Sequence, residues 1–472
     1  ATANNVKLLC CNNSSVTGAT VSSGTMTTSG DPTASTDSPF DDPAAFTFGD
    51  AGDQNVIKCG SYIGNGSATG PEIFLGFEPQ WVLIKDTTAG DTQDWNLIDS
   101  MRGFIDGDDD KFLMPNASTQ ELEYDFGSLT PTGFKLKQDN DAHNGDGRTY
   151  IYIAIRRPDG YVGKPPELGT GVFDVILSTS LNAPPLFKPT NFPVDFATTR
   201  VVTSAHNWNT GSRLTGESLL NLDTTGAGSD NSNLTWDFNN GWNDYTVGGS
   251  YYSWMWKRHA GFDVVTYKGT NAAGLQIPHS LSKIPEMIWI KNRDDGGDRW
   301  MVYHKGLNGG SSPEDYYLAL NENWAETDYH GMWNDTAPTS THFTLGNHSQ
   351  VNSDDDEKYI AMLFASVDGI SDLGTYSGSS SNIVVNVGFQ PRFLIIKDLL
   401  TSGRSWVVLD TTRGWTSTSE KQLFLNESWG ESTFGTTSAV QRTDTGFTID
   451  STNSAQINDG STSSKYIYYA HA

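Results

Sequence analysis

The sequence predicts an all-β chain of four tandem antiparallel β-sandwich units, of the jelly-roll or lectin-like kind, preceded by an extended N-terminal arm. Three observations predict this fold class. One pattern of apolar strand, polar hairpin and second apolar strand recurs along the chain. Short apolar runs alternate with turns, and 48 of the 472 residues are glycine. No stretch has the periodicity of an amphipathic helix.

The recurring pattern is clearest at 388–410, which reads GFQPRFLIIKDLLTSGRSWVVLD. A proline-led apolar strand ends on Lys397, and a second strand ends on Asp410. Residues 76–99 repeat the pattern as GFEPQWVLIKDTTAGDTQDWNLID, and residues 284–304 repeat it as IPEMIWIKNRDDGGDRWMVYH. Self-similarity at this spacing is the signature of a repeat protein.

Apolar closing strands mark the end of each unit. Each closing run begins at a tyrosine, and ten positions later stands Gly160, Gly261 or Gly369. Uniformly apolar runs of this length are typical of strands in the middle of a sheet. The predicted segments are an N-terminal arm and docking segment over 1–54 and β-sandwich units over 55–164, 165–261, 262–373 and 374–472, the unit over 165–261 being degenerate.

The last unit shows the expected order of elements within one copy. Its predicted strands are 374–376, 393–396, 406–409, 423–426, 445–448 and 466–470. With the turns between them, each unit offers about seven short strands over roughly a hundred residues, which is typical of an antiparallel sandwich. The joints between units are short, so we expect neighbouring units to pack against each other.

The N-terminal 54 residues have a different composition from the rest of the chain. They are rich in Ser, Thr and Gly and contain few large apolar side chains. Such a segment cannot bury enough surface to fold alone. We therefore expect an extended arm that packs on a neighbouring subunit or on a docking protein, with a flexible tail as the alternative.

Charge and cysteine content exclude several classes of partner and site. The chain has 30 basic and 56 acidic residues, a formal net charge of −26. Nucleic acids and anionic membranes require clustered Lys and Arg, so neither is an expected partner. No apolar run is long enough to span a bilayer, which argues against membrane insertion. Three cysteines without regular spacing predict neither a disulfide framework nor a zinc site.

Acidic runs are the first candidate for chemistry. The runs at 106–110 (DGDDD), 354–357 (DDDE) and 139–147 offer several oxygen ligands that Ca²⁺ could use. The third run opens like a calcium-binding loop but has Tyr150 where a bidentate Glu is needed. We interpret all three as solvated hairpin tips, and we predict no metal site and no cofactor.

Paired carboxylates are the second candidate, because glycoside hydrolysis uses two of them. Asp99 and Asp410 occupy equivalent places in two copies of the pattern, with His304 in the third. A position that recurs in different copies is a requirement of the fold, whereas an active site would stand in one copy only. We therefore predict no catalytic residue and no enzymatic activity.

Aromatic residues in polar loops are the third candidate. Trp324 and Trp429 follow a Leu-x-Leu-Asn strand in two units, and further tryptophans lie in loops nearby. A flat apolar ring with hydrogen-bonding groups at its rim is what binding of a sugar requires. The predicted glycan- or receptor-binding residues are Trp415, Trp429, Asn426, Glu427, Trp324 and Trp333. The alternative is that these tryptophans cap sandwich ends or fill subunit contacts.

Lysines end the first strand of the recurring pattern in three units. They are Lys85, Lys291 and Lys397. We interpret them as charges at a sheet edge or rim, where they would discourage strand pairing between sheets.

The motifs GFDVVTYKGT, IPEMIWIKNRDDGGDRWMVYHKGL, YLALN, APTSTHFTLG and YIAMLFASVDG, together with YYSWMWKRHAGFDVVTYKG and the N-terminal VKLLCC, carry a family resemblance. The chain resembles, over most of its length, the repeated domain of predicted virion and tail-fibre structural proteins of marine bacteriophages. The resemblance implies a lectin-like sandwich and a place on the surface of the phage particle. It supplies no catalytic residues.

The expected function is therefore that of a non-enzymatic virion structural protein, a tail fibre or appendage that contacts the host cell surface. One alternative is a capsid or tail decoration protein that binds only other virion proteins, and a second is a polysaccharide depolymerase. The expected partners are further copies of the chain in a homo-oligomer (a trimer), other virion proteins through the N-terminal arm, and a host surface glycan.

Overall fold

The computed structural model describes residues 9–10, 19–21 and 57–472, without 69, 89, 91, 105–108, 131, 157–167, 179–184, 188–191, 237, 239, 245–250, 354–356, 435–438 and 452–453. The chain divides into two compact parts, Ala1–Asn55 and Val56–Ala472. In the first part, β1 (Leu9–Cys10) pairs antiparallel with β2 (Ala19–Val21). The rest of the predicted arm lies outside the described residues.

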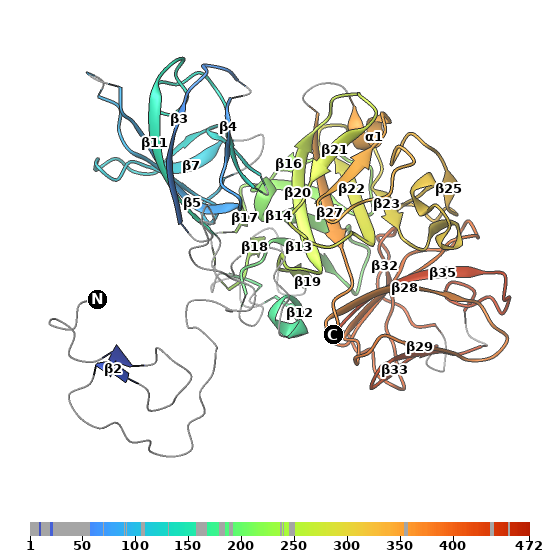
Figure 1. Cartoon of the computed structure of the whole chain (residues 1–472). Coiled ribbons are helices and arrows are strands. Elements are labelled where there is room, and N and C mark those ends of the chain that lie inside the picture. The colour runs from blue at the N-terminus through green and yellow to red at the C-terminus, as the bar shows by residue number, and fades with distance from the viewer. Residues whose placement is uncertain are drawn as a thin grey trace. The chain divides into compact units, whose positions relative to one another are not determined.

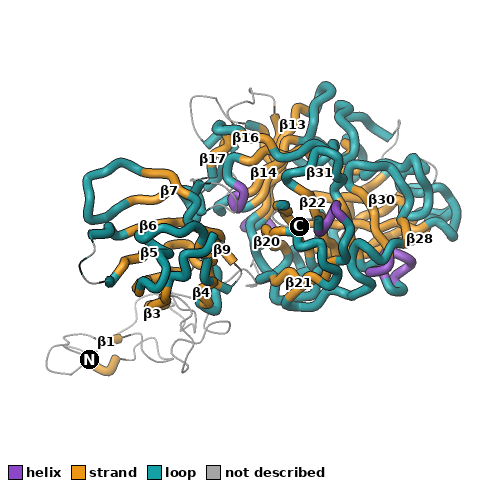
Figure 2. The backbone as a smooth tube through the Cα atoms, turned by 90° about the horizontal axis from the view of Figure 1, so that it is seen from above, coloured by secondary structure: helices purple, strands orange, loops and turns teal. Residues whose placement is uncertain are grey.

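The described part of the chain is all-β, as the sequence predicts (Figures 1 and 2). Its helical elements are short: α1 (Ser349–Asn352) and the 3-10 turns Gly169–Gly171, Arg213–Thr215, Leu307–Gly310 and Pro313–Asp315. All strand pairs in the sheets are antiparallel. The fold class predicted from the recurring pattern is thus confirmed.

The described strands form four main sheets with one order of pairing. Sheet A contains β3 (Ile57–Ile63), β11 (Thr149–Arg156), β5 (Pro79–Asp86), β6 (Asn96–Asp99), β7 (Asp110–Leu113) and β8 (Leu122–Tyr124). Sheet B contains β12 (Phe173–Leu177), β19 (Tyr251–Trp256), β13 (Phe196–Val201), β14 (Asn209–Ser212), β15 (Ser218–Asn221) and β16 (Ser229–Asp230). Sheet C contains β20 (Phe262–Lys268), β27 (Lys358–Phe364), β22 (Met287–Asn292), β23 (Met301–His304), β24 (Tyr316–Ala319) and β25 (Thr327–Asp328). Sheet D contains β28 (Ser371–Ser377), β35 (Lys465–His471), β30 (Phe393–Asp398), β31 (Val407–Asp410) and β32 (Leu423–Phe424).

Smaller sheets complete the sandwiches. Their strands are β4 (Glu72–Phe74), β10 (Gly133–Leu136) and β9 (Gly127–Thr130) in one sheet, β17 (Leu234–Thr235) and β18 (Asn243–Asp244) in a second, β21 (Leu275–Pro278) and β26 (His342–Leu345) in a third, and β29 (Ile383–Asn386), β34 (Gly446–Ile449) and β33 (Val440–Thr443) in a fourth. Each shares a hydrophobic core with one main sheet, as the two layers of a sandwich must.

The strand register makes positions in the four main sheets equivalent. The first tyrosine of the closing strand pairs with Asp86 in sheet A, with Asn292 in sheet C and with Asp398 in sheet D. Counting back one residue from each places Lys85, Lys291 and Lys397 at one position. In sheet B, the same register places Arg200 there. This register defines the equivalent positions compared below.

Sheets B, C and D bury both of their faces. In β30 of sheet D, Leu394 and Ile396 belong to the core of that sandwich, whereas Phe393 and Ile395 face a core shared with sheets B and C. Strands buried on both faces read as continuous apolar runs instead of alternating ones, which explains the sequence FLII. Three sandwiches therefore surround one common core, and we call this assembly of sheets B, C and D the ring.

Sheet A packs differently. Its β5 and β11 alternate between buried side chains and half-exposed or exposed ones. The buried set, including Val82, Ile84 and Ala154, belongs to the core between sheet A and its own smaller sheet. A buried arginine, Arg258, pairs with Glu78 from this sandwich at 2.5 Å and with Asp263 at 2.6 Å.

Candidate functional site

Two of the predicted receptor-binding tryptophans lie inside the protein. Trp415 is fully buried in the core of the sheet D sandwich, and its Nε1 donates to the Val440 carbonyl oxygen at 2.9 Å. Trp333 is buried in the sheet C sandwich, and its Nε1 donates to the Tyr316 carbonyl oxygen at 2.9 Å. Their loops fold over the ends of the sandwiches, where a large ring fills the core and the indole N–H finds a backbone acceptor. The prediction of both as surface residues is wrong.

Asn426 is also a structural residue. It is buried, and its Oδ1 accepts the backbone N–H of Trp406 at 2.8 Å. Asn321 binds the N–H of Trp300 in the same way at 3.0 Å, and the carboxylate of Asp223 binds that of Trp208 at 2.9 Å. The Asn or Asp that ends the Leu-x-Leu-Asn strand therefore fixes the neighbouring strand in three sheets. It is not free to hydrogen-bond a ligand, contrary to the prediction for Asn426.

The other predicted aromatic residues are exposed. Trp429 is 59% exposed and Trp324 is 38% exposed. The guanidinium of Arg299 lies 4.5 Å from the centre of the Trp324 ring. Glu427 is half-buried beside Trp429, and burial, followed by the charge of Asp223, raises the pKa of its carboxyl group. Of the predicted set, Trp429, Trp324 and Glu427 are the residues that a ligand could reach.

The loops that carry these exposed tryptophans also join one sheet to the next. The guanidinium of Arg200 in sheet B donates to the carbonyl oxygens of Glu427 at 3.0 Å and Ser428 at 2.9 Å. Lys397 in sheet D donates to the carbonyl oxygen of Trp324 at 2.9 Å. Lys291 in sheet C donates to that of Thr225 at 3.2 Å. Cations at one equivalent position thus donate hydrogen bonds to equivalent loops, and each loop belongs to the neighbouring sheet.

The lysine interpretation drawn from the sequence is therefore wrong for Lys291 and Lys397. Both are buried, and burial lowers the pKa of each to about 8. Each is the second-last residue of its strand, close to the strand end that the pattern predicts, but that end lies between two sandwiches instead of at an open edge. Each ammonium group is satisfied by backbone carbonyls, which compensates its removal from water.

A second set of bonds closes the ring through tryptophan side chains. Trp300 Nε1 donates to the carbonyl oxygen of Asn221 at 2.8 Å, which joins sheet C to sheet B. Trp406 Nε1 donates to that of Ala319 at 3.0 Å, which joins D to C. Trp208 Nε1 donates to that of Phe424 at 2.8 Å, which joins B to D.

The three acceptors of these bonds are equivalent, because each is the x of a Leu-x-Leu-Asn or Leu-x-Leu-Asp segment. The three donors are also equivalent, each standing just before or at the start of the second strand of the recurring pattern. The bonds therefore run in one direction around the ring and make it a cyclic, threefold-like assembly within one chain. This arrangement was not predicted from the sequence. The signal was the tryptophan that stands directly before the second strand of the recurring pattern.

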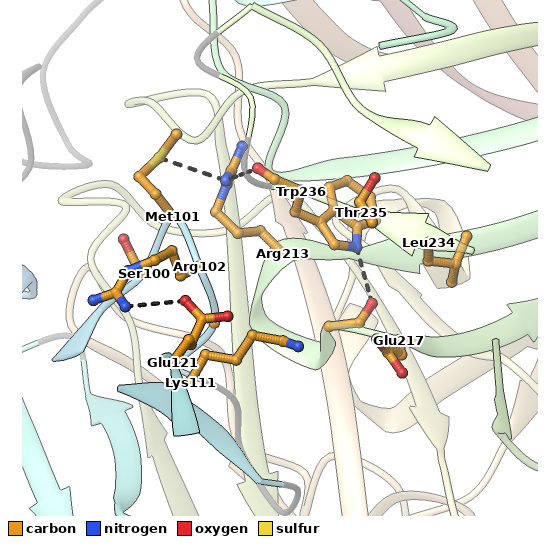
Figure 3. A pocket seen from close by; sticks show the side chains of 12 residues that line it. Ser100, Met101, Arg102, Lys111, Glu121, Arg213, Glu217, Leu234, Thr235 and Trp236 are labelled. Atoms are coloured by element: carbon orange, nitrogen blue, oxygen red, sulfur yellow. Dashed lines mark hydrogen bonds and ion pairs between the residues drawn. The ribbon is translucent and has the colours of Figure 1, made fainter. Parts of the chain in front are cut away.

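A cavity of about 240 Å³ lies between the sheet A sandwich and sheet B (Figure 3). One wall carries Arg102 and Lys111, and the other carries Arg213 and Trp236. The charged groups are paired: Arg102 with Asp99 at 2.7 Å and with Glu121 at 3.1 Å, and Lys111 with Glu123 at 2.8 Å. Arg213 donates to the carbonyl oxygen of Val194 at 2.8 Å. These pairings describe a polar joint between two sandwiches.

The predicted carboxylate pair has the same structural role in both copies. Asp99 pairs with Arg102, and Asp410 pairs with Arg413 at 2.5 Å. Asp410 also accepts the indole N–H of Trp254 from sheet B at 3.1 Å. Equivalent ion pairs at equivalent strand ends are what a requirement of the fold predicts.

The acidic runs are only partly described. Residues 106–108 and 354–356 lie outside the described residues. In the third run, Asp141 pairs with Arg148 at 2.7 Å. Within the described ranges, no group of three or more His, Cys, Asp and Glu side chains is placed to hold a metal ion. Nor does that part of the chain contain a helix long and apolar enough to cross a membrane.

Comparison with known proteins gives one family. The chain matches the family described as "Domain of unknown function (DUF7483)" over residues 2–157 and 196–472. No curated protein and no solved structure matches the chain. The two matched segments cover most of the sequence, including sheets A, C and D and most strands of sheet B. The chain therefore belongs to the DUF7483 domain family.

Proposed function

We propose that the chain is a non-enzymatic structural protein of a bacteriophage virion, a tail fibre or similar appendage that contacts the host cell surface. The observation that carries the proposal is that the recurring polar and aromatic residues form the joints between sandwiches. Trp208, Trp300 and Trp406 form the bonds that join three sandwiches into a ring. Conserving the relative positions of the sandwiches through such joints suits a structural protein, which must transmit mechanical force and hold its surfaces in fixed positions.

We assign contact with a host glycan to the loop of the ring that carries Glu427 and Trp429. Trp429 presents an exposed indole in a loop whose backbone is held by Arg200, so little conformational entropy is lost on binding. Glu427 offers a neighbouring carboxyl group for hydrogen bonds. One stacking contact contributes about 1 kcal/mol, so several copies of the chain acting together are needed for useful avidity.

A decoration protein that binds only other virion proteins is the second candidate. The observation that favours it is that both exposed tryptophans stand in loops that already serve as joints. The carbonyl oxygen of Trp324 accepts from Lys397, and the N–H of Glu431 donates to the Val202 carbonyl oxygen at 2.6 Å. In this second candidate, the exposed faces of the two indoles contact a further virion protein beside the existing joints.

Replacing Trp429 by alanine should separate these candidates. We expect the purified wild-type chain to compete with phage particles for adsorption to host cells, and the Trp429→Ala chain to compete at least about tenfold less well, since loss of about 1 kcal/mol per site is multiplied over several sites. Thermal stability should change little, because the side chain is exposed. The measurement is adsorption of infectious particles as a function of competitor concentration.

The matched control is Tyr329→Ala. It removes another exposed aromatic side chain, 40% exposed, which directly follows β25 of sheet C. Immunogold labelling of intact particles locates the chain on the tail or on the head. Labelling on the head, with adsorption unaffected by the wild-type chain, supports the decoration role. Particles that carry no label at all contradict the virion assignment.

A further inference from the structure

In the part of the chain that the structure describes, one face of sheet A is largely apolar and is not covered by another main sheet as its counterparts are. Only its margin at Lys111 lies near sheet B, across the cavity described above. The face carries Trp81, Leu83, Ile153 and further half-exposed side chains of β5, β6 and β11. At its margin, Ile57 is 49% exposed and Ile151 is 41% exposed. The positions equivalent to these in sheet C are all buried in the shared core of the ring: Phe262, Met287, Trp289, Ile360 and Met362. We call this surface the open face of sheet A.

The open face also repeats the bonding groups of the ring. Trp95 stands where Trp208, Trp300 and Trp406 stand in the other sheets, and its backbone N–H donates to Asn116 Oδ1 at 2.9 Å. This is the bond that Asn321 and Asn426 make in their sheets. Lys85 donates to the carbonyl oxygen of Gln93, as Lys291 does to that of Asp298.

Among the described residues, Trp95 and Asn116 of the open face form no hydrogen bond to a neighbouring sheet. In the part of the chain that the structure describes, no acceptor is bonded to Trp95 Nε1. Asn116 and the loop that follows it are exposed, whereas the equivalent Asn321 and Asn426 are buried. Sheet A thus carries both halves of the ring joint, the tryptophan donor and the Leu-Met-Pro-Asn acceptor strand, and no sheet among the described residues is bonded to either half.

We propose that the open face binds the open faces of two further copies of this chain, so that three A sheets form a second ring around a threefold axis. Trp95 Nε1 of each copy donates to the Met114 carbonyl oxygen of the next, as Trp300 does to Asn221 within the chain. Lys85 extends towards the loop at 117–119 of the next copy, as Lys397 does to the Trp324 loop.

The ring within the chain is the reason for choosing three copies of one chain as the occupants. Its joints are heterologous: each sheet uses a donor side towards one neighbour and an acceptor side towards the other. Such contacts close only if the rotation between neighbours closes. The ring shows that sheets of this topology, joined by these bonds, close with three members. A face with both donor and acceptor sides is complementary to itself under that rotation and needs no other partner.

This inference does not depend on the proposed virion role. It deals with self-association of the chain, and its test uses the purified full-length protein. Sedimentation velocity at micromolar concentration should give a species of three times the chain mass of 51.4 kDa. Leu83→Glu and Ile153→Glu each place a carboxylate in the centre of the open face, and each should shift the protein to the monomer at the same concentration.

The control variant is Val384→Glu, an equally drastic change at a strand position that is 74% exposed in the smaller sheet beside sheet D. It should remain trimeric. Leu83 and Ile153 are half-exposed in the single chain, so their variants should keep the circular dichroism spectrum and melting temperature of a folded protein. Retention of the fold distinguishes a broken interface from a broken domain.

The Cys59 thiol gives an independent readout. It is a free, exposed thiol on the open face, and its equivalents Val175, Val264 and Leu373 are buried in the ring. In a Cys10→Ser, Cys11→Ser background, a maleimide reagent should modify Cys59 at least tenfold more slowly in the trimer than in the Leu83→Glu monomer.

Three results would overturn the proposal. The first is a wild-type chain that is monomeric at tens of micromolar. The second is a trimer that persists in both glutamate variants, since the interface would then lie elsewhere. The third is a monomer in which Cys59 is nevertheless protected, because another segment of the same chain would then cover the face.

Discussion

Replacing Trp300 by alanine is expected to lower the free energy of unfolding by about 3–5 kcal/mol, the usual cost of removing a large buried aromatic side chain. Trp300 is fully buried in the shared core, so its removal leaves a cavity where three sandwiches meet. It also leaves the carbonyl oxygen of Asn221 without its donor. Urea denaturation followed by far-ultraviolet circular dichroism measures the loss.

Two further variants define the origin of that loss. Trp300→Phe keeps most of the ring volume but removes the donor, and should cost about 1–2 kcal/mol. Trp429→Ala removes the same type of side chain from an exposed position and should change stability by less than about 0.5 kcal/mol. Equal losses for Trp300→Ala and Trp429→Ala would show that the ring bond has no special weight in stability.

Acidification is expected to destabilise the chain at pH values well above those at which carboxylates titrate. Burial lowers the pKa of His304 and of His471 to about 3. The neutral ring of His304 also accepts the N–H of Gly306 at Nδ1, at 3.0 Å, a bond that a protonated ring cannot make. The unfolded chain titrates near pH 6.5, so it binds more protons than the folded chain below that pH.

The sign follows from this difference in bound protons. The stability that these histidines contribute is complete above pH 6.5 and is lost as the pH falls from 6.5 towards 3. Between pH 6.5 and 5, each histidine should remove about 1.7 kcal/mol, so the pair should remove about 3.3 kcal/mol. Chemical denaturation at several pH values measures the slope.

Variants of these histidines provide the control for the pH experiment. His304→Gln cannot titrate, so its average slope between pH 6.5 and 5 should be smaller by about 1.1 kcal/mol per pH unit, whatever its stability at pH 7. A slope that is unchanged in this variant would show that His304 becomes protonated in the folded protein. A wild-type chain with a flat profile above pH 5 would contradict the prediction for both histidines.

The strands could be predicted from the sequence because their signals are local. The pattern at 388–410 yields β30 at Phe393–Asp398 and β31 at Val407–Asp410, with the polar hairpin between them. Apolar β-branched runs bounded by Gly and Pro fix strand positions without reference to distant residues.

Which aromatic side chain would be exposed could not be predicted in the same way. Trp415 and Trp429 both stand in polar loops of one sandwich, yet one is buried and the other is 59% exposed. The difference depends on which loop folds across the end of the sandwich, and this is decided by packing between residues far apart in sequence. Local composition contains no information on that packing.

The ring was missed for a related reason. A lysine that ends an apolar strand usually marks an edge, and Lys397 has that sequence context. Its burial follows from three sheets packing together, a property of the assembly instead of the strand. The signal that was present is that WVLIK, MIWIK and FLIIK are apolar on both faces. Two of these strands are covered on both sides, and the uncovered one belongs to sheet A.

The closed ring has a consequence for how the chain folds during synthesis. Trp208 is bonded to a residue 216 positions later, and Arg200 to one 228 positions later. Contacts so distant in sequence form late and slowly. At ribosomal rates of about 5–20 residues per second, the interval between these partners lasts on the order of ten to forty seconds. Until sheet D is made, sheet B, and sheet C once it has formed, expose a wide apolar face, so a chain truncated before Phe424 should depend on chaperones or aggregate.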